Sequence, residues 1–356
     1  MQRRGLPRLG ARLRSGDEAR IAAFGGSITY EGYYVAGLTR VIAQAYPKAV
    51  VRSLTLGLPG FASEVGVFRT RSAAELKADL TLVEFAVHDA GSPPEVTARA
   101  VEGIVRQLRA ADPDREIAFV YFGHLQTIRD GAMRAVLETW EKIAEYYSIP
   151  SFDGIALAEA LVKNGQAAWF ARWQGTRVWD VPQPFPLTRD GGLHTASGGS
   201  VLGAQIAQAM LPMLDTHELK TSSEPPPPLD RLQWSDALAM RGVALRGEGW
   251  TGGPISDGMA DRGAAIYFDE LLAANDAGAK LRIPFTGRYA TVWTIGAGGT
   301  VAAAIDGKWS ILKARDDQLQ HPFNLLNAEE NRPHVLEIEA RNVPAVVAGV
   351  DLLGKL

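Results

Sequence analysis

The 356-residue chain contains no cysteine, which excludes disulfide bonds, thiolate metal ligands and cysteine nucleophiles. It has no run of about 18 apolar residues, the length of a membrane-spanning helix, so we expect no membrane span. The net charge of −3 favours neither nucleic acid nor an anionic membrane as a partner. Apolar residues make up 46% of the chain and charged residues 22%, which predicts a globular protein, and the length fits two domains. The oligomeric state is left open.

The first 20 residues carry six arginines but no apolar stretch of about 7–15 residues, so they lack the pattern of a secretory signal. We interpret this segment as a solvated arm. The localisation stays open: cytoplasmic if the sequence is full length, periplasmic or secreted if a signal has been trimmed from it.

The first two thirds of the chain alternate short apolar runs with helical patterns. Residues 80–87 (LTLVEFAV) are almost wholly apolar, as expected for a strand that is buried on both faces. The alternation predicts a parallel sheet covered by helices on both sides. The predicted strands are residues 20–24, 50–56, 80–87 and 116–122, and the predicted helices are 34–45, 101–111, 134–147 and 200–214.

Residues 222–230 (SSEPPPPLD) mark a domain boundary, because four consecutive prolines favour an extended, semi-rigid spacer. After this segment, β-like runs separated by Gly, Asn and Asp predict a β-sandwich. We therefore expect an α/β domain over 1–221, a linker over 222–230 and a β-sandwich domain over 231–356. The β-like runs are residues 264–268, 280–285, 290–295, 301–305, 334–340 and 346–352.

Candidate catalytic residues lie near the predicted strand ends, the edge at which open parallel sheets form binding sites. Ser27 follows two glycines in a turn between a strand and a helix, which suits a nucleophile, although a serine that only caps a helix has the same pattern. His194 precedes the last helix, and Asp190 lies close enough to fix its tautomer, although an exposed loop histidine also fits. Gly57 and His88 end two other strands and are candidate donors to an oxyanion.

In their order along the chain, these motifs resemble those of the SGNH (GDSL-like) hydrolase superfamily. Gly26-Ser27 resembles the nucleophile block in a Gly-Gly-Ser-Ile-Thr variant, and Gly57 falls at the position of the oxyanion glycine. His88 and Asp89 fall in the Gly-x-Asn-Asp block. Asp190 and His194 fall in the Asp-x-x-His block. The resemblance covers about residues 19–215 and implies a flavodoxin-like, three-layer α/β fold.

The sequence departs from the family pattern at two places. His88 replaces the family's asparagine, and a histidine ring donates with a different reach and a pH-dependent charge. Three residues, rather than two, separate Asp190 from His194. A bulge at Gly191-Gly192 would absorb the extra residue; otherwise Asp190 misses the histidine, and a backbone carbonyl orients it instead.

The resemblance implies acyl transfer without a metal or an organic cofactor. Ser27 attacks an ester, His194 takes its proton and Asp190 orients His194. The N–H groups of Ser27 and Gly57, together with His88, hold the oxyanion.

Substrate binding is indicated by an aromatic and basic stretch over residues 167–185, which contains Trp169, Arg172 and Trp173 and continues through Arg177 and Trp179. These side chains are candidates for lining a sugar groove, although the rings would equally pack a loop against the sheet. The predicted second domain resembles galactose-binding-like jelly rolls, which accompany carbohydrate esterases and are elsewhere only structural appendages.

Three functions are compatible with this reading. The first is a carbohydrate esterase that removes O-acyl groups, most plausibly acetyl, from a bacterial-type polysaccharide. The second is an O-acyltransferase that uses the same residues and excludes water better. The third is a non-catalytic glycan-binding protein with a decayed hydrolase fold, which His88 and the Asp190–His194 spacing favour.

Overall fold

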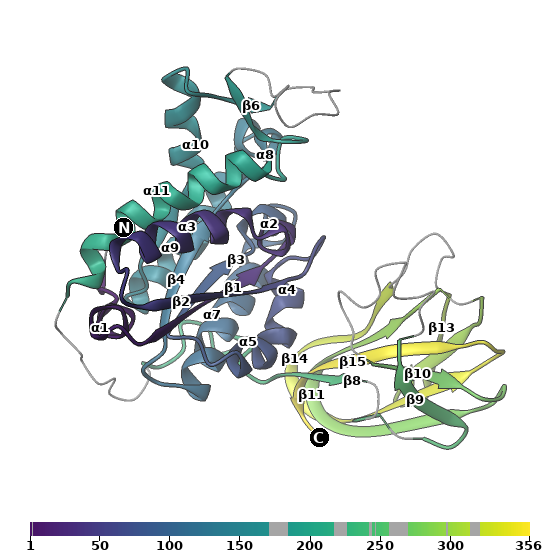
Figure 1. Cartoon of the computed structure of the whole chain (residues 1–356). Coiled ribbons are helices and arrows are strands. Elements are labelled where there is room, and N and C mark those ends of the chain that lie inside the picture. Colours follow the sequence, from purple (N-terminus) through teal and green to yellow (C-terminus); the bar gives the residue numbers. More distant parts are fainter. Residues whose placement is uncertain are drawn as a thin grey trace. The chain divides into compact units, whose positions relative to one another are not determined.

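The chain divides into two compact units, Met1–Ser235 and Asp236–Leu356 (Figure 1). The computed structural model describes residues 1, 3–170, 184–216, 226–241, 244–245, 247–255, 270–296, 298–313 and 321–356.

The first unit is built on a five-stranded, all-parallel sheet with the strand order β2-β1-β3-β4-β5. The middle strands β1, β3 and β4 consist almost wholly of buried residues, as their apolar sequences predict. The third strand is shorter than expected, because the last two residues of the predicted strand, 86–87, begin helix α6. The strands are β1 (Glu18–Gly25), β2 (Val50–Gly57), β3 (Leu80–Glu84), β4 (Glu116–Tyr121) and β5 (Ser151–Asp153).

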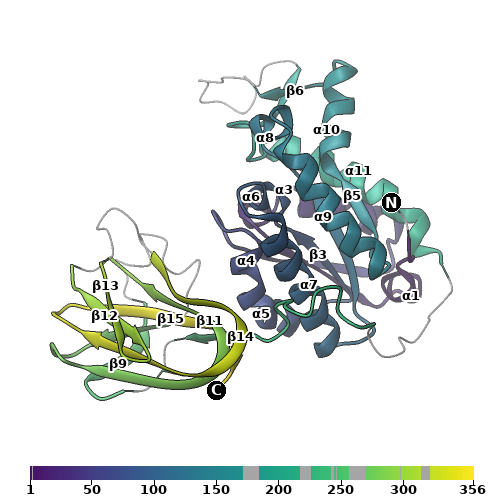
Figure 2. The same ribbon diagram turned by 180° about the vertical axis from the view of Figure 1, so that it is seen from behind.

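Helices cover both faces of this sheet (Figures 1 and 2). One apolar core joins the sheet to α1 (Pro7–Ser15), α3 (Tyr33–Ala45), α10 (Gly154–Lys163) and α11 (Ala196–Leu214). Figure 2 shows the other face, where α7 (Pro94–Ala111) and α9 (Ala132–Tyr146) lie with α4 (Ser63–Gly66), α5 (Thr70–Glu75) and α6 (Ala86–Asp89). The remaining elements are α2 (Ser27–Glu31), the 3-10 helix η1 (Val67–Arg69), α8 (Leu125–Arg129) and the parallel pair β6 (Ala167–Phe170) and β7 (Phe185–Thr188). No helix in the described ranges is long and apolar enough to cross a membrane.

The N-terminal segment is a packed helix, so the expectation of a solvated arm is wrong. Leu6, Leu9 and Leu13 are each at most 1% exposed and belong to the core shared with α3 and α11. These leucines recur at intervals of three and four residues, which is the spacing of one helix face. The spacing of the leucines, and not the arginines that lie between them, therefore indicates the structure of this segment.

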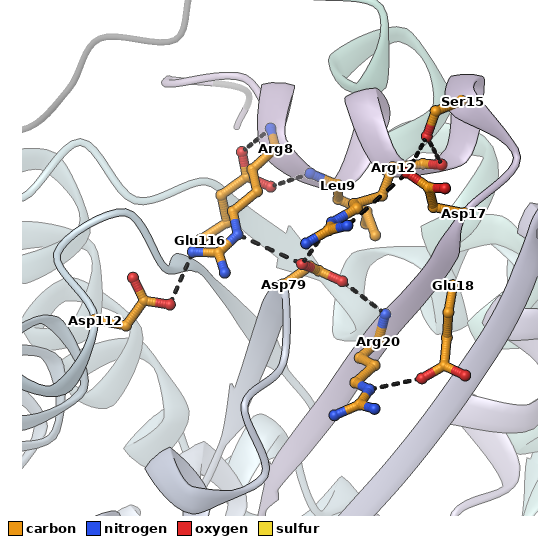
Figure 3. A network of polar contacts seen from close by, with 10 residues as sticks. All are labelled: Arg8, Leu9, Arg12, Ser15, Asp17, Glu18, Arg20, Asp79, Asp112 and Glu116. Atoms are coloured by element: carbon orange, nitrogen blue, oxygen red, sulfur yellow. Dashed lines mark hydrogen bonds and ion pairs between the residues drawn. The ribbon is translucent and has the colours of Figure 1, made fainter.

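Buried carboxylates fix helix α1 to the sheet (Figure 3). Glu116, the first residue of β4, accepts hydrogen bonds from the backbone N–H groups of Arg8 and Leu9, at 2.7 and 3.0 Å. These groups lie in the first turn of the helix, where backbone donors have no partner within the helix. Asp79 forms ion pairs with Arg8 and Arg12, at 3.4 and 3.7 Å. Arg8 and Arg12 therefore contact the α/β unit instead of extending into solvent.

The described part of the proline-rich segment belongs to the first unit. The carbonyl of Pro226 accepts a hydrogen bond from Arg106 Nη1 at 2.8 Å, and Glu102 accepts one from the Leu229 N–H at 2.7 Å. Arg106 and Glu102 both lie on α7, so residues 226–229 are attached to this helix.

The described residues of the second unit form an eight-stranded antiparallel β structure, with the strand order β13-β12-β14-β11-β15-β10-β9 and β8 paired to β15. The expected runs 280–285 and 290–295 form one long strand, which continues through a register shift between Gly287 and Tyr289. The expected run 264–268 lies outside the described residues. The strands are β8 (Ala237–Arg241), β9 (Trp250–Pro254), β10 (Glu270–Ala274), β11 (Lys280–Thr294), β12 (Val301–Ile305), β13 (Lys308–Leu312), β14 (His321–Ala340) and β15 (Val346–Lys355).

Candidate active site

The turn that carries Ser27 lies at the carboxyl edge of the parallel sheet. Gly25, the last residue of β1, is in register with Gly57 of β2 on one side and Glu84 of β3 on the other. A Cβ atom on Gly25 would lie 2.2 Å from the carbonyl oxygen of Glu84, so only glycine fits here. The chain then turns at Gly26, and Ser27 is the first residue of α2.

His88 faces the serine from the neighbouring strand end. It lies in α6, directly after β3, and its Nε2 is 3.5 Å from Ser27 Oγ. The ring packs on Gly26, where a Cβ atom would come within 3.1 Å of His88 Cδ2. Burial lowers the pKa of His88, so the ring is neutral near pH 7. The structure thus brings Ser27 and His88 together.

Gly57 packs directly on the helix that Ser27 begins. A Cβ atom at Gly57 would lie 2.3 Å from the backbone nitrogen of Tyr30 and 2.4 Å from its Cα. A larger residue would push α2 away from the end of β2. Ser27, Gly57 and His88 therefore lie at the same edge of the sheet.

His194 is a buried, neutral histidine. Its side chain is held edge-on against Phe122, with the ring centroids 4.5 Å apart, and it borders an apolar pocket that Ile155, Leu187 and Leu202 also line. Burial lowers the pKa of His194 to about 4. Its Nδ1 has no hydrogen-bond partner among the described residues. The ring is therefore uncharged at neutral pH.

Asp190 is bound within its own turn. Its Oδ1 accepts hydrogen bonds from the backbone N–H groups of Gly192 and Leu193, at 2.9 and 2.8 Å. This is a local turn of the kind that Asp commonly forms. The structure does not join Asp190 to His194, and it shows no backbone carbonyl at His194 Nδ1 among the described residues either.

Two contacts hold the loop that carries His194. Arg189 forms a 2.8 Å ion pair with Glu31, the last residue of α2, and so ties the histidine loop to the helix that Ser27 begins. Trp169 Nε1 donates to the carbonyl of Gly191 at 3.1 Å. The indole N–H of Trp169 therefore supports the loop. This agrees with the alternative in which the ring packs a loop against the sheet instead of lining a sugar groove.

The remaining members of the aromatic and basic set lie outside the described residues: Arg172, Trp173, Arg177 and Trp179. The ring of His124 supports the loop that carries His194. Its Nδ1 accepts the N–H of Gln126 at the start of α8, and a Cβ atom on Gly192 would lie 2.9 Å from its Cδ2.

Glu84, Thr29 and Tyr34, none of them a predicted site residue, form a buried polar group next to the serine turn. Thr29 Oγ1 donates to Glu84 Oε2 at 3.0 Å and lies 3.1 Å from the Tyr34 hydroxyl. The sequence feature that could have indicated this group is Glu84, because it is a charged residue within the otherwise apolar run of residues 80–87.

No protein-family model and no curated protein sequence matches the chain. Solved structures do match the chain in their fold. A two-domain esterase (CEX) active on acetylated mannans superposes with a TM-score of 0.74 at 18% identity, over 99% of this chain and 97% of that one. A two-domain esterase of the same description, co-crystallized with mannopentaose, gives 0.73 at 17% identity, over 99% and 96%. The chain has the fold of these two-domain esterases. The predicted fold class, a parallel α/β unit followed by an antiparallel β unit, is thereby confirmed.

Proposed function

We propose that the protein is a serine esterase that removes O-acyl groups, chiefly O-acetyl, from a polysaccharide. The observation that carries this proposal is the position of Ser27 next to His88 at the carboxyl edge of the sheet. Ser27 Oγ lies 3.5 Å from His88 Nε2, and Gly57 ends the neighbouring strand β2. A neutral histidine, His194, lies on a loop tied to the same helix. The solved two-domain esterases of the same fold act on acetylated mannans, which makes acetylated mannan the first polysaccharide to test.

The first half of the reaction transfers the acyl group to the enzyme. Ser27 Oγ attacks the ester carbonyl carbon while its proton passes to His194. The N–H groups of Ser27 and Gly57 and the Nε2–H of His88 hold the negative oxygen that forms. His194 then gives its proton to the sugar oxygen as the ester bond breaks, which leaves acyl-Ser27 and a free sugar hydroxyl.

The second half releases the acid. Water attacks acyl-Ser27 and passes its proton to His194, which returns it to Ser27 Oγ as the carboxylic acid leaves. An acyltransferase would use a sugar hydroxyl in place of this water.

Within this proposal, Asp190 acts on the histidine through the loop. Its hydrogen bonds to Gly192 and Leu193 shape the two residues that precede His194. The catalytic unit is then a serine–histidine pair without an aspartate in contact with the ring.

The proposal is tested with wild type and Ser27→Ala, assayed on p-nitrophenyl acetate and by acetate release from acetylated mannan. Ser72→Ala, which changes an exposed serine on α5, is the matched control. We expect turnover by wild type and by the control, and none above background by Ser27→Ala. If all three proteins are inert on acyl substrates but bind the polysaccharide, the glycan-binding function that His88 favours replaces the esterase.

A further inference from the structure

Glu84 holds the serine turn on both sides of Ser27. It ends β3 and is fully buried. Its backbone carbonyl accepts the Gly26 N–H at 2.9 Å, and its Oε2 accepts the Thr29 hydroxyl at 3.0 Å. Gly26 precedes the serine and Thr29 lies two residues after it, so both flanks of the nucleophile are bound to one residue.

The same group of contacts reaches the histidine. The Tyr34 hydroxyl lies 3.1 Å from Thr29 Oγ1, and the Tyr34 ring packs edge-on against Phe122, with the centroids 5.1 Å apart. Phe122 in turn packs edge-on against His194. A continuous buried path therefore connects Glu84 with both the nucleophile turn and the histidine ring.

Glu84 lacks a positive partner. Within the described part of the chain, its Oε1 has no hydrogen-bond partner and no cation affects its ionisation. The ionisable groups that face it are Tyr34 from α3 and Asp89 from α6, and the charge of Asp89 opposes a second negative charge. Burial raises the pKa of Glu84 to about 8, against the opposing effect of its hydrogen bonds from Thr29 and Gly26. The carboxyl group is thus uncharged at neutral pH.

An uncharged acid suits this position because the proposed reaction builds a negative oxygen on the same turn. A buried carboxylate beside that oxygen would repel it in a low-dielectric setting. We infer that Glu84 is a positioning residue for the nucleophile: through its contacts with Gly26 and Thr29 it fixes the turn that presents Ser27. Its carboxyl group does this without a charge. The inference rests on the proposed esterase function.

The test compares the pH profiles of kcat for wild type, Glu84→Gln and Glu84→Ala between pH 6 and pH 10. Wild type should lose kcat above about pH 8, as Glu84 ionises. Glu84→Gln, which keeps an acceptor for Thr29 and cannot ionise, should stay near the wild-type kcat at pH 7 and lack this decline. Glu84→Ala should lower kcat at pH 7 by about 100-fold with little change in KM, because the turn loses its support.

Asp89→Asn is the matched control, because burial also raises the pKa of Asp89, to about 7. This variant should retain the decline, moved to lower pH, because the charge of Asp89 no longer opposes the ionisation of Glu84. A decline that persists in Glu84→Gln, or that disappears in Asp89→Asn instead, overturns the inference while leaving the esterase proposal intact. A wild type that is inert at every pH contradicts the esterase proposal and this inference with it.

Thr29→Val provides a second route if the Glu84 variants do not fold. It removes the hydroxyl that bonds Glu84 and keeps the volume of the side chain. The expected result is a lower kcat at pH 7 with KM unchanged, and a kcat equal to that of wild type overturns the inference.

Discussion

Ser27 Oγ and His88 Nε2 lie 3.5 Å apart across the edge of the sheet. This distance is long for a hydrogen bond, so the imidazole is near the serine without being bound tightly to it. A neutral imidazole donates only from the nitrogen that carries its hydrogen. His88 is therefore able to stabilise an oxyanion at Ser27 in the tautomer with the hydrogen on Nε2.

This relationship predicts the effects of two substitutions at position 88. His88→Ala should lower kcat by about 100- to 1000-fold, the usual cost of losing one oxyanion donor. His88→Asn should recover most of that loss, because the amide is also a hydrogen-bond donor and asparagine is the residue of the SGNH pattern. Kinetics on p-nitrophenyl acetate measure both. Equal kcat values for wild type and His88→Ala would show that His88 does not hold the oxyanion.

A second prediction concerns Asp190. Asp190→Asn should retain kcat close to that of wild type, because the amide oxygen still accepts the N–H groups of Gly192 and Leu193. An aspartate that orients a catalytic histidine behaves differently, since its replacement by asparagine lowers kcat by about 10,000-fold. Single-turnover and steady-state rates of the variant distinguish the two cases. A loss of that size would place Asp190 in contact with His194 during the reaction.

The pH dependence at the acid side follows from His194. The ring must be neutral to take the proton of Ser27, and burial lowers its pKa to about 4. The value of kcat/KM should therefore stay level from neutral pH downward and fall only as the pH approaches 4. Circular dichroism at each pH verifies that the protein is folded. An acid limb near pH 6.5 would mean that the histidine that takes the proton is solvated.

His194 also affects stability in this range. Its pKa in the folded state lies below its value in the unfolded chain, so the unfolded state binds more protons between about pH 4 and pH 6.5. The free energy of unfolding should therefore decrease as the pH falls through this window. Replacing His194 by Gln, which does not titrate, should reduce the slope in urea unfolding experiments.

The carboxyl edge of the sheet was predictable because parallel strands end on the same side. The alternation of apolar runs and helical patterns predicted the strands in chain order, and three of the four predicted strand ends carried a candidate residue. Ser27, Gly57 and His88 therefore converge even though 61 residues separate the serine from the histidine. The close approach of Gly25 to the Glu84 carbonyl explains why the serine motif requires a glycine there.

The partners of the side chains were less predictable, because hydrogen bonding depends on rotamers and loop paths that no local pattern encodes. Asp190 was expected at His194, yet two backbone N–H groups within its own turn satisfy it. Glu84 was counted as part of an apolar strand, and its bond to Thr29 appears only once β1 and β3 lie side by side.

The N-terminal helix α1 supplies the last prediction. Leu9 is fully buried in the core shared with α3 and α11, whereas the side chain of Arg12 is about half exposed despite its ion pair with Asp79. Leu9→Ala should lower the free energy of unfolding of the first unit by about 2–5 kcal/mol, the range for a large buried side chain. Arg12→Ala should cost less than about 1 kcal/mol, since exposed ion pairs contribute little.

Urea unfolding followed by circular dichroism and tryptophan fluorescence measures both variants. The fluorescence signal includes Trp140, which is buried in the first unit beside Phe119. If the two substitutions cost the same small amount, α1 is not part of the folded core and the segment behaves as the solvated arm that its arginines suggested. A large difference between them shows that the leucine face, and not the charges, makes the first residues of the chain part of the α/β unit.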